Sequence, residues 1–223
     1  MSYVTDWSDD LWRGYLRDYH RIVEETDVQV GRIMEALRES GLEEETLVVF
    51  TSDHGEGMAA HHWVVKLMLY ENPVTVPLVF RWPGVIEAGR VDRTHLASGV
   101  DLLPTICDFA GVPVDPQVTG VSLRPVIERP DLPGQPFVVT ELDPNPDEPA
   151  KTGRMVRTDR FKYMVFSHGR RPEMLFDLDS DPGEMHNLVS KPEFADELRR
   201  HRQLLKEWQT ATNDTFRAER NAL

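Results

Sequence analysis

The 223-residue sequence has a single cysteine, Cys107, and no apolar run of the ~20 residues that a membrane span requires. One cysteine excludes an intrachain disulfide and a cysteine-based zinc site. Basic residues are also scarce, since 25 Lys and Arg stand against 38 Asp and Glu, which gives a net charge of −13. Because nucleic acid binds to basic surfaces, we do not expect a nucleic acid as a partner. Because the sequence has no apolar run long enough for a membrane span, we do not expect a membrane either.

The first residues, 1–7, lack the basic start and the apolar stretch of a signal peptide. A secreted protein can lack disulfides, so the sequence assigns no compartment. Hydrophobic residues make up 40% of the chain and charged residues 28%, which is typical of a globular protein. The acidic balance favours solubility, and a site for an anion would need local positive charge from a metal or from basic side chains.

The first part of the chain alternates between helical and strand patterns, as α/β domains do. Apolar residues at three- and four-residue spacing predict one long helix over residues 9–39, with Ser8 as its N-cap. Apolar runs predict strands over 46–51 and 76–81, the first of them buried on both faces of a mainly parallel sheet. A short helix is expected over residues 101–110.

Composition changes near residue 128, where a stretch rich in proline and acidic residues begins. The candidate strands beyond that point are residues 137–142, 154–158, 161–166 and 174–178, followed by a helix over 192–209. We therefore expect two domains: residues 1–127 as a partial α/β core, and residues 128–223 as a small antiparallel sheet with one C-terminal helix.

Asp53 and His54 follow the first predicted strand directly, within Ser52-Asp53-His54-Gly55-Glu56. Ligands of open α/β sheets collect beyond the carboxyl ends of the strands. Asp53 offers a hard oxygen ligand and His54 an imidazole, so the pair is a candidate metal site. The alternative is a strand-end turn in which both side chains are solvated polar caps.

Lys66 and His61 lie a short distance further along the chain. A lysine near a metal can bind a doubly charged anion as a point charge, and it can donate a proton to a departing oxygen. Taken alone, Lys66 is equally a surface residue, and the pair His61-His62 is equally a surface or packing feature.

The order and spacing of these residues resemble the second half of the sulfatase signature. The resemblance covers about residues 9 to 210. It rests on residues 27–47, on Ser52-Asp53-His54-Gly55-Glu56, His61, Lys66, Tyr70-Glu71 and Val76-Pro77-Leu78, and on residues 101–105, 110–113, 119–123, 157–163, 175–184 and 187–188.

Membership of that family implies an alkaline-phosphatase-like α/β sandwich, of which this chain would be the second half, followed by the small antiparallel subdomain. Sulfatases hydrolyse sulfate esters with a bound calcium and a formylglycine made from Cys or Ser. The resemblance makes Asp53 and His54 calcium ligands. It makes Lys66 the contact for sulfate and the group that stabilises charge on the leaving oxygen, and it places His61 near the site as a second candidate catalytic residue.

The sequence departs from the family at the nucleophile, whose motif is Cys/Ser-x-Pro/Ser/Ala-x-Arg. Neither Cys107 nor Ser52 is followed by the required residues, and we expect Cys107 to be a core residue. The family's N-terminal pair of metal-binding Asp residues also has no counterpart. We therefore expect the isolated chain to be an inactive fragment that holds calcium weakly, because calcium takes ~6–8 oxygen ligands.

Three functions remain open at this point. The first is half of a sulfatase for a sulfated small molecule or glycan, completed by a missing N-terminal half. The second is a non-catalytic remnant that acts as a binding or structural module. The third is a phosphodiesterase or phosphatase of the same superfamily, which needs further His ligands, for which His95 is a poor candidate. We also expect uncovered apolar surface to drive association, for example as a homo-oligomer, and the loop 143–151 to be a candidate part of a substrate pocket.

Overall fold

The computed structural model describes residues 6–143 and 152–218 of the chain. Contacts divide the chain into two compact units. The N-terminal unit comprises Met1–Lys66 and Thr75–Arg90, and the C-terminal unit comprises Leu67–Val74 and Val91–Leu223. Residues 91–127 are therefore grouped with the C-terminal strands. The domain boundary expected from the composition, between residues 127 and 128, stays a prediction.

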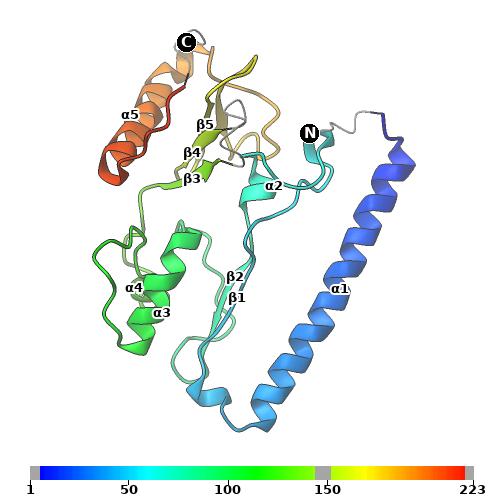
Figure 1. Ribbon diagram of the computed structural model, residues 1–223, viewed down its shortest axis with the longest axis vertical. Coiled ribbons are helices and arrows are strands. Elements are labelled where there is room, and N and C mark those ends of the chain that lie inside the picture. Colours follow the sequence, from blue (N-terminus) through cyan, green and yellow to red (C-terminus); the bar gives the residue numbers. More distant parts are fainter. Residues whose placement is uncertain (1–5, 144–151, 219–223) are drawn as a thin grey trace. The chain divides into compact units, whose positions relative to one another are not determined.

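The predicted helices and strands follow one another in the predicted order, and the short helices α2 and α4 are additional to them, as Figure 1 shows. In chain order they are α1 (Asp9–Glu39), β1 (Val48–Thr51), α2 (Glu71–Val74), β2 (Leu78–Arg81), α3 (Leu102–Ala110), α4 (Arg124–Glu128), β3 (Val138–Leu142), β4 (Gly153–Arg157), β5 (Phe161–Phe166), β6 (Glu173–Asp177) and α5 (Ala195–Thr212).

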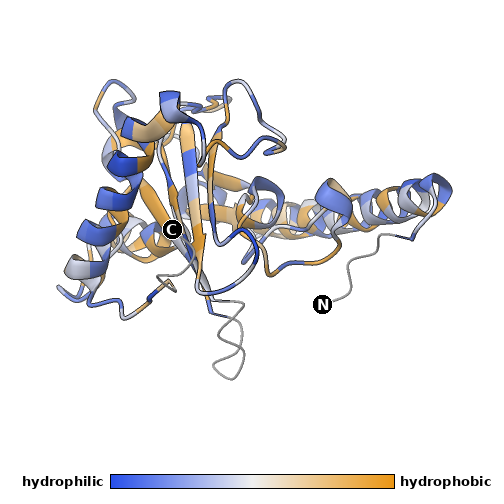
Figure 2. Ribbon diagram, turned by 90° about the horizontal axis from the view of Figure 1, so that it is seen from above, coloured by the Kyte–Doolittle hydropathy of each residue, from blue (hydrophilic) through white to orange (hydrophobic). Residues whose placement is uncertain are grey.

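The long helix α1 has the bounds predicted from its apolar spacing. Ser8 caps its N-terminus, where the Ser8 side chain accepts a hydrogen bond from the Leu11 amide, and two aspartates stand in the first turn. Trp12 is its buried residue, whereas the apolar side chains in the middle of the helix are exposed, among them Ile22, Val28 and Ile33. Hydrophobic positions accordingly recur along α1 in Figure 2.

The strand β1 differs from the expected strand of a mainly parallel, fully buried sheet. It pairs antiparallel with β2, and in the described residues these two strands form a sheet of their own. The cross-strand pair Phe50 and Val79 is exposed to 41% and 51%. The apolar run does form a strand, but within the described residues β1 has only β2 as a sheet partner and its side chains are not fully buried.

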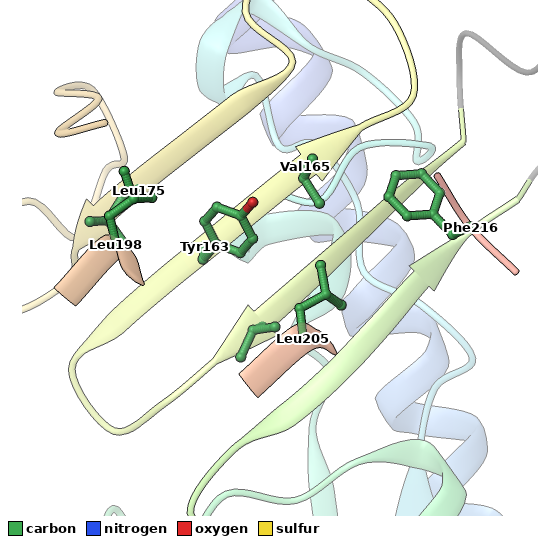
Figure 3. Packing of buried hydrophobic residues seen from close by; sticks show 7 residues of the cluster. Tyr163, Val165, Leu175, Leu198, Leu205 and Phe216 are labelled. Atoms are coloured by element: carbon green, nitrogen blue, oxygen red, sulfur yellow. The ribbon is translucent and has the colours of Figure 1, made fainter. Parts of the chain in front are cut away.

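The C-terminal unit contains a four-stranded antiparallel sheet in the order β3-β4-β5-β6. Alternate residues of each strand point to opposite faces, which sorts the side chains into two cores. On one face, α5 packs against the cluster shown in Figure 3, which contains Val156, Tyr163, Val165, Leu175, Leu198, Leu205 and Phe216. On the other face, Leu69 and the segment around α2 pack against a methionine-rich cluster.

The mixed helices and strands, with the small antiparallel sheet and its C-terminal helix, confirm the α/β class predicted from the sequence. The expectation for Cys107 needs a correction, because it is only half-buried. The face of α3 that packs inward carries Pro104, Thr105 and Phe109, while the apolar neighbours of Cys107 are on the exposed side. None of the helices in residues 6–143 and 152–218 combines the length and apolarity needed to cross a membrane.

Candidate active site

Asp53 stands just beyond the end of β1, in the N-terminal unit. Its side chain is 81% exposed, and its Oδ1 accepts hydrogen bonds from the His54 amide at 2.9 Å and from the Ser52 hydroxyl at 3.3 Å. The backbone hydrogen bond from His54 holds the pKa of Asp53 below its ordinary value. Asp53 is therefore an anion at neutral pH, with its Oδ2 turned toward the imidazole of His54, 3.5 Å from Nε2.

His54 is held in one tautomer by its own backbone neighbour. Its Nδ1 lies 2.7 Å from the carbonyl oxygen of Gly55, and a carbonyl can only accept, so Nδ1 carries the proton. The lone pair of Nε2 is therefore available as an acceptor. A ring N–H bound to a backbone carbonyl is the usual support of a metal-binding histidine.

Lys66 occupies that lone pair. Its Nζ donates to Nε2 of His54 across 2.7 Å. The structure thus brings together three of the four predicted site residues, Asp53, His54 and Lys66. Nε2 of His54 and Oδ2 of Asp53 are both acceptors and lie 3.5 Å apart, and at Nε2 the lysine ammonium is the donor.

The loop from Gly57 to Lys66 makes this approach possible by turning back on itself. The Gly57 amide donates to the Val65 carbonyl at 2.8 Å, and the Ala59 amide donates to the Trp63 carbonyl at 3.1 Å. The buried Trp63 then donates its indole N–H to the carbonyl of Lys66 at 3.1 Å. Gly57 has no space for a side chain, because a Cβ there would lie 2.7 Å from the Trp63 carbonyl oxygen.

His61, the fourth predicted residue, lies in the same loop, in a short 3-10 turn (Ala60–His62). It is half-buried and has a left-handed backbone, with a φ of 54°. Its catalytic role stays a prediction. Ser52 donates its hydroxyl to the carbonyl of His54 at 3.0 Å, which makes it a local cap of the strand-end turn.

Sequence reasoning missed the part that Glu56 and Tyr15 play beside the site. The Tyr15 hydroxyl donates to Oε1 of Glu56 at 2.5 Å, and the same oxygen accepts the Val65 amide. Burial and the Glu56 carboxylate raise the pKa of Tyr15, so the phenol stays protonated. In the sequence Tyr15 belongs to the apolar stripe of α1, and a half-buried phenol signals only that some partner is needed.

The donor set can be compared with what a resident cation requires. Within residues 6–143 and 152–218, no group of three or more His, Cys, Asp or Glu side chains is placed to hold a metal. Asp53 and His54 supply one anionic oxygen and one nitrogen lone pair on a common side, whereas calcium takes ~6–8 oxygens. The pair therefore fits a cation as one side of its coordination shell.

His95, considered for a two-metal relative, is engaged inside the C-terminal unit. Its Nδ1 lies 2.6 Å from Oδ2 of Asp92, and its Nε2 lies 2.8 Å from the Leu132 carbonyl oxygen. A Cβ at Gly134 would lie 2.6 Å from its ring. His95 is therefore a packing residue. The loop considered as part of a substrate pocket lies, over residues 144–151, outside the described residues.

Two protein-family models match the chain. The model described as "Sulfatase" matches residues 3–112. The model described as "N-sulphoglucosamine sulphohydrolase, C-terminal" matches residues 59–211, which is more than half of the chain. Both matches include Lys66, and the first also includes Asp53 and His54.

Known proteins match the chain over nearly its whole length. The Delta 4,5-hexuronate-2-O-sulfatase of Bacteroides thetaiotaomicron is 33% identical over 221 residues, which are 98% of this chain and 46% of that protein. A structure solved in complex with its substrate, D-glucosamine-2-N,6-O-disulfate, has a TM-score of 0.85 at 31% identity and covers 94% of this chain and 43% of its own. The phosphonate monoester hydrolase of Agrobacterium radiobacter has a TM-score of 0.83 at 30% identity, covering 94% of this chain and 44% of its own. The chain spans less than half the length of each.

Proposed function

The chain belongs to the sulfatase family of the alkaline phosphatase-like superfamily, and from this premise we propose that Asp53, His54 and Lys66 form one side of a site that hydrolyses sulfate esters of sugars. The observation that carries the proposal is the approach of Lys66 Nζ to His54 Nε2, at 2.7 Å, beside the Asp53 carboxylate. If Asp53 and His54 were only solvated caps of a strand-end turn, there would be no reason for a constrained loop to bring the Lys66 ammonium to Nε2 of His54.

The substrate class is proposed from the names of relatives. One relative is named for a 2-O-sulfated hexuronate, and a similar structure was solved with a glucosamine disulfate. A sulfated glycan is therefore the substrate that we propose for the complete site. The net charge of −13 means that attraction for such an anion must come from local cations.

Each of the three residues has a role that its geometry supports. Lys66 would place its ammonium against the sulfate oxygens and stabilise charge on the leaving oxygen. Asp53, as an anion, and His54, through the Nε2 lone pair that the Nδ1–H tautomer leaves and that Lys66 occupies here, would hold the calcium from one side. When bound, calcium would lower the cost of negative charge on the sulfate oxygens.

These 223 residues do not contain the nucleophile motif of the family, Cys/Ser-x-Pro/Ser/Ala-x-Arg, at Cys107 or at Ser52. Cys107 is followed by Asp108 and Phe109, which departs from the motif, and it lies on α3 of the C-terminal unit. We therefore propose that the chain by itself does not turn over sulfate esters, and that turnover requires a segment bearing the formylglycine. Incubation of the purified chain with 4-nitrophenyl sulfate should release no sulfate above the rate of a heat-denatured sample, and clear turnover would contradict this.

Lys66 and a metal cation compete for the same lone pair in this arrangement. A cation that binds Nε2 of His54 requires the ammonium of Lys66 to leave that nitrogen, which frees it to meet an anion. Replacing Lys66 by methionine should therefore tighten cation binding and weaken anion binding, whereas a solvated cap would respond to neither.

Terbium luminescence tests the cation side without any need for activity. Tb³⁺ is a luminescent substitute for calcium and can be excited through a nearby tryptophan, here Trp63 in the same loop. We expect a Tb³⁺ signal that calcium displaces, that Lys66→Met strengthens and that Asp53→Asn lowers at least ~tenfold, since a paired carboxylate is worth more than a neutral ligand. The control is Asp18→Asn, which removes an exposed acid of α1. Equal signals in Asp53→Asn and Asp18→Asn would contradict the proposal.

Hydrolysis of a phosphonate or phosphate ester is the second candidate, favoured by the likeness to the phosphonate monoester hydrolase at 30% identity. An oxygen and an imidazole also suit the transition metals that such chemistry uses. Binding of inorganic sulfate and of phenylphosphonate to the calcium-loaded and manganese-loaded chain separates the two. Preference for sulfate with calcium supports the first candidate, and preference for phenylphosphonate with manganese supports the second.

A further inference from the structure

Glu56 is not one of the three residues of the proposed site, yet its carboxylate accepts from the amide of Val65, the residue before Lys66. The geometry points to Glu56 as a positioning residue that, together with Tyr15 of α1, fixes the loop so that Lys66 extends from it beside His54, where its ammonium reaches Nε2 or an anion next to it. This inference rests on the proposed function for its meaning, because the position of Lys66 matters only if that lysine meets an anion.

The loop that carries Lys66 adopts a backbone that its own residues disfavour. Left-handed φ angles occur at the non-glycine residues Met58, Ala59, His61, His62, Val65 and Leu67. Val65 is the most demanding of these, because a β-branched residue at a φ of 64° is a genuine outlier. Such conformations persist only where surrounding contacts enforce them.

Both backbone polar groups of Val65 form hydrogen bonds within the unit. Its amide donates to Oε1 of Glu56, and its carbonyl accepts the Gly57 amide at 2.8 Å. Consecutive residues 56 and 57 thus fix both backbone polar groups of Val65. The next residue is Lys66, so the direction in which its side chain leaves the loop is set by these two bonds.

Glu56 is itself anchored to the long helix. The Tyr15 hydroxyl donates to it at 2.5 Å, and one turn earlier Trp12 packs edge-on against His62 of the loop, with ring centroids 5.7 Å apart. Because one oxygen of Glu56 accepts from both a helix side chain and the Val65 amide, it connects α1 to the segment that presents Lys66. A charged acceptor forms stronger hydrogen bonds than a neutral one.

A purely structural tie would make a different prediction from a positioning role. Loss of a structural tie lowers the stability of the unit and leaves the contact between Lys66 and His54 in the folded protein. Loss of a positioning group breaks that contact in protein that is still folded. The imidazole ¹⁵N signals of His54 distinguish these cases, because the Nε2 signal reports whether an ammonium donates to it.

The experiment compares Glu56→Ala, Glu56→Gln and Tyr15→Phe with Lys66→Met as the reference for a lost contact. Glu25→Ala, which removes an exposed acid from α1, is the matched control. We expect Glu56→Ala to move the His54 Nε2 signal to the Lys66→Met position, Glu56→Gln to retain most of the wild-type signal because its amide oxygen can still accept, and Tyr15→Phe to fall between them.

Trypsin supplies a second readout in the same samples. Cleavage after Lys66 requires the loop to open, so Glu56→Ala should accelerate it roughly tenfold, which is what loss of a charge-assisted hydrogen bond implies. Amide exchange of the β5 strand serves as the check that the rest of the protein is folded. An unshifted Nε2 signal together with unchanged cleavage in Glu56→Ala overturns the inference.

Failure of the proposed function would look different. If wild-type protein binds neither Tb³⁺ nor sulfate, the sulfatase role of the site fails, while the His54 signal and the trypsin rate still decide whether Glu56 positions Lys66. If binding is present but Glu56→Ala leaves both readouts unchanged, the site stands and the role of Glu56 fails.

Discussion

The two units of the chain differ in how much of their apolar surface they cover themselves. The strands β4, β5 and β6 are buried almost throughout, with Val156, Met164 and Leu175 fully enclosed. In the N-terminal unit, by contrast, Ile22, Ile33 and other apolar side chains are exposed. The C-terminal sheet therefore has its own core on both faces, while the unit with the candidate site is held largely by polar contacts and a few aromatic ones.

Because of this difference, the stability of the C-terminal unit and the position of Lys66 depend on different residues. Removal of a core side chain should unfold the C-terminal unit and should barely affect the N-terminal helix. Conversely, the position of Lys66 depends on single hydrogen bonds: Glu56 accepts from the Val65 amide, Gly57 donates to the Val65 carbonyl, and Trp63 donates to the Lys66 carbonyl.

Replacement of Lys162 by methionine should be the most damaging change in the C-terminal unit. The side chain is fully buried, and its Nζ lies 2.8 Å from Oε1 of Glu184 and 3.1 Å from Oε1 of Glu71. Without it the buried Glu184 carboxylate loses its counter-charge, which typically costs about 3–5 kcal/mol. Amide exchange in β5 measures the loss.

The exposed Lys191→Met is the control for that change and should stay within about 0.5 kcal/mol of wild type. The double variant Lys162→Met with Glu184→Gln should recover part of the loss, because the buried side chain at position 184 then carries no unpaired charge. A cost for Lys162→Met as small as that of Lys191→Met would contradict a self-supporting core.

A matched pair of truncations compares the units directly. Leu175→Ala empties a fully buried position in β6 and should lower the free energy of unfolding by about 2–5 kcal/mol. Ile33→Ala removes a side chain that is 67% exposed on α1 and should change it by less than about 0.5 kcal/mol. Urea denaturation measures both values, and similar costs at the two positions would remove the distinction between the units.

Asp177 makes the C-terminal unit sensitive to acid. Arg160 donates to both oxygens of this buried carboxylate, at 2.8 and 2.7 Å, and lowers the pKa of Asp177 to about 2. Since the folded-state pKa lies below the unfolded value of ~3.9, the stabilisation, roughly 2 kcal/mol, is present above pH ~4 and lost as the pH falls toward about 2.

Asp177→Asn should therefore lose that stabilisation at neutral pH and should flatten the dependence between pH ~4 and about 2. Asp196→Asn, at a carboxylate that is 90% exposed on α5, is the comparison and should follow the wild-type curve. If the free energy of unfolding of wild type and of Asp177→Asn fell in the same way with acid, Arg160 would not be stabilising the Asp177 carboxylate.

Substitutions at the exposed apolar positions should have the smallest effect on stability. They should instead change the association between copies of the chain. Phe50→Lys and Ile33→Glu place charges on side chains that are 41% and 67% exposed. They should change stability little and should lower the apparent mass of any oligomer in light scattering, because exposed apolar surface favours association. An unchanged mass would show that these positions are not where copies of the chain meet.

The sequence predicted local structure well where one pattern dominates. The bounds of α1 and β5 agree with their apolar spacing, and the candidate strand over 174–178 lies within one residue of β6. The surroundings of β1 were predicted wrongly, because a short apolar run does not reveal whether other strands are present to bury it. Cys107 was placed in the core for a related reason, since an apolar helix face identifies no partner.

The motif residues of the site could be predicted from the sequence, but the residues that hold the loop of Lys66 in place could not. Asp53, His54 and Lys66 were found from order and spacing, and the structure brings them together. The contact between Tyr15 and Glu56 joins residues that are distant in sequence, and it depends on how a loop with several left-handed residues folds back. No periodicity or composition signal encodes such a turn, so these supports become visible only in three dimensions.

Sulfate binding by wild type and Lys66→Met, in the presence and absence of calcium, tests the central claim most directly. Isothermal titration of inorganic sulfate should detect weak binding to wild type that strengthens with calcium, and at least ~tenfold weaker binding to Lys66→Met, since a charged hydrogen bond to the anion is lost. Identical sulfate affinity in both proteins, with no response to calcium, would contradict the assignment of Asp53, His54 and Lys66 to one side of a sulfatase site.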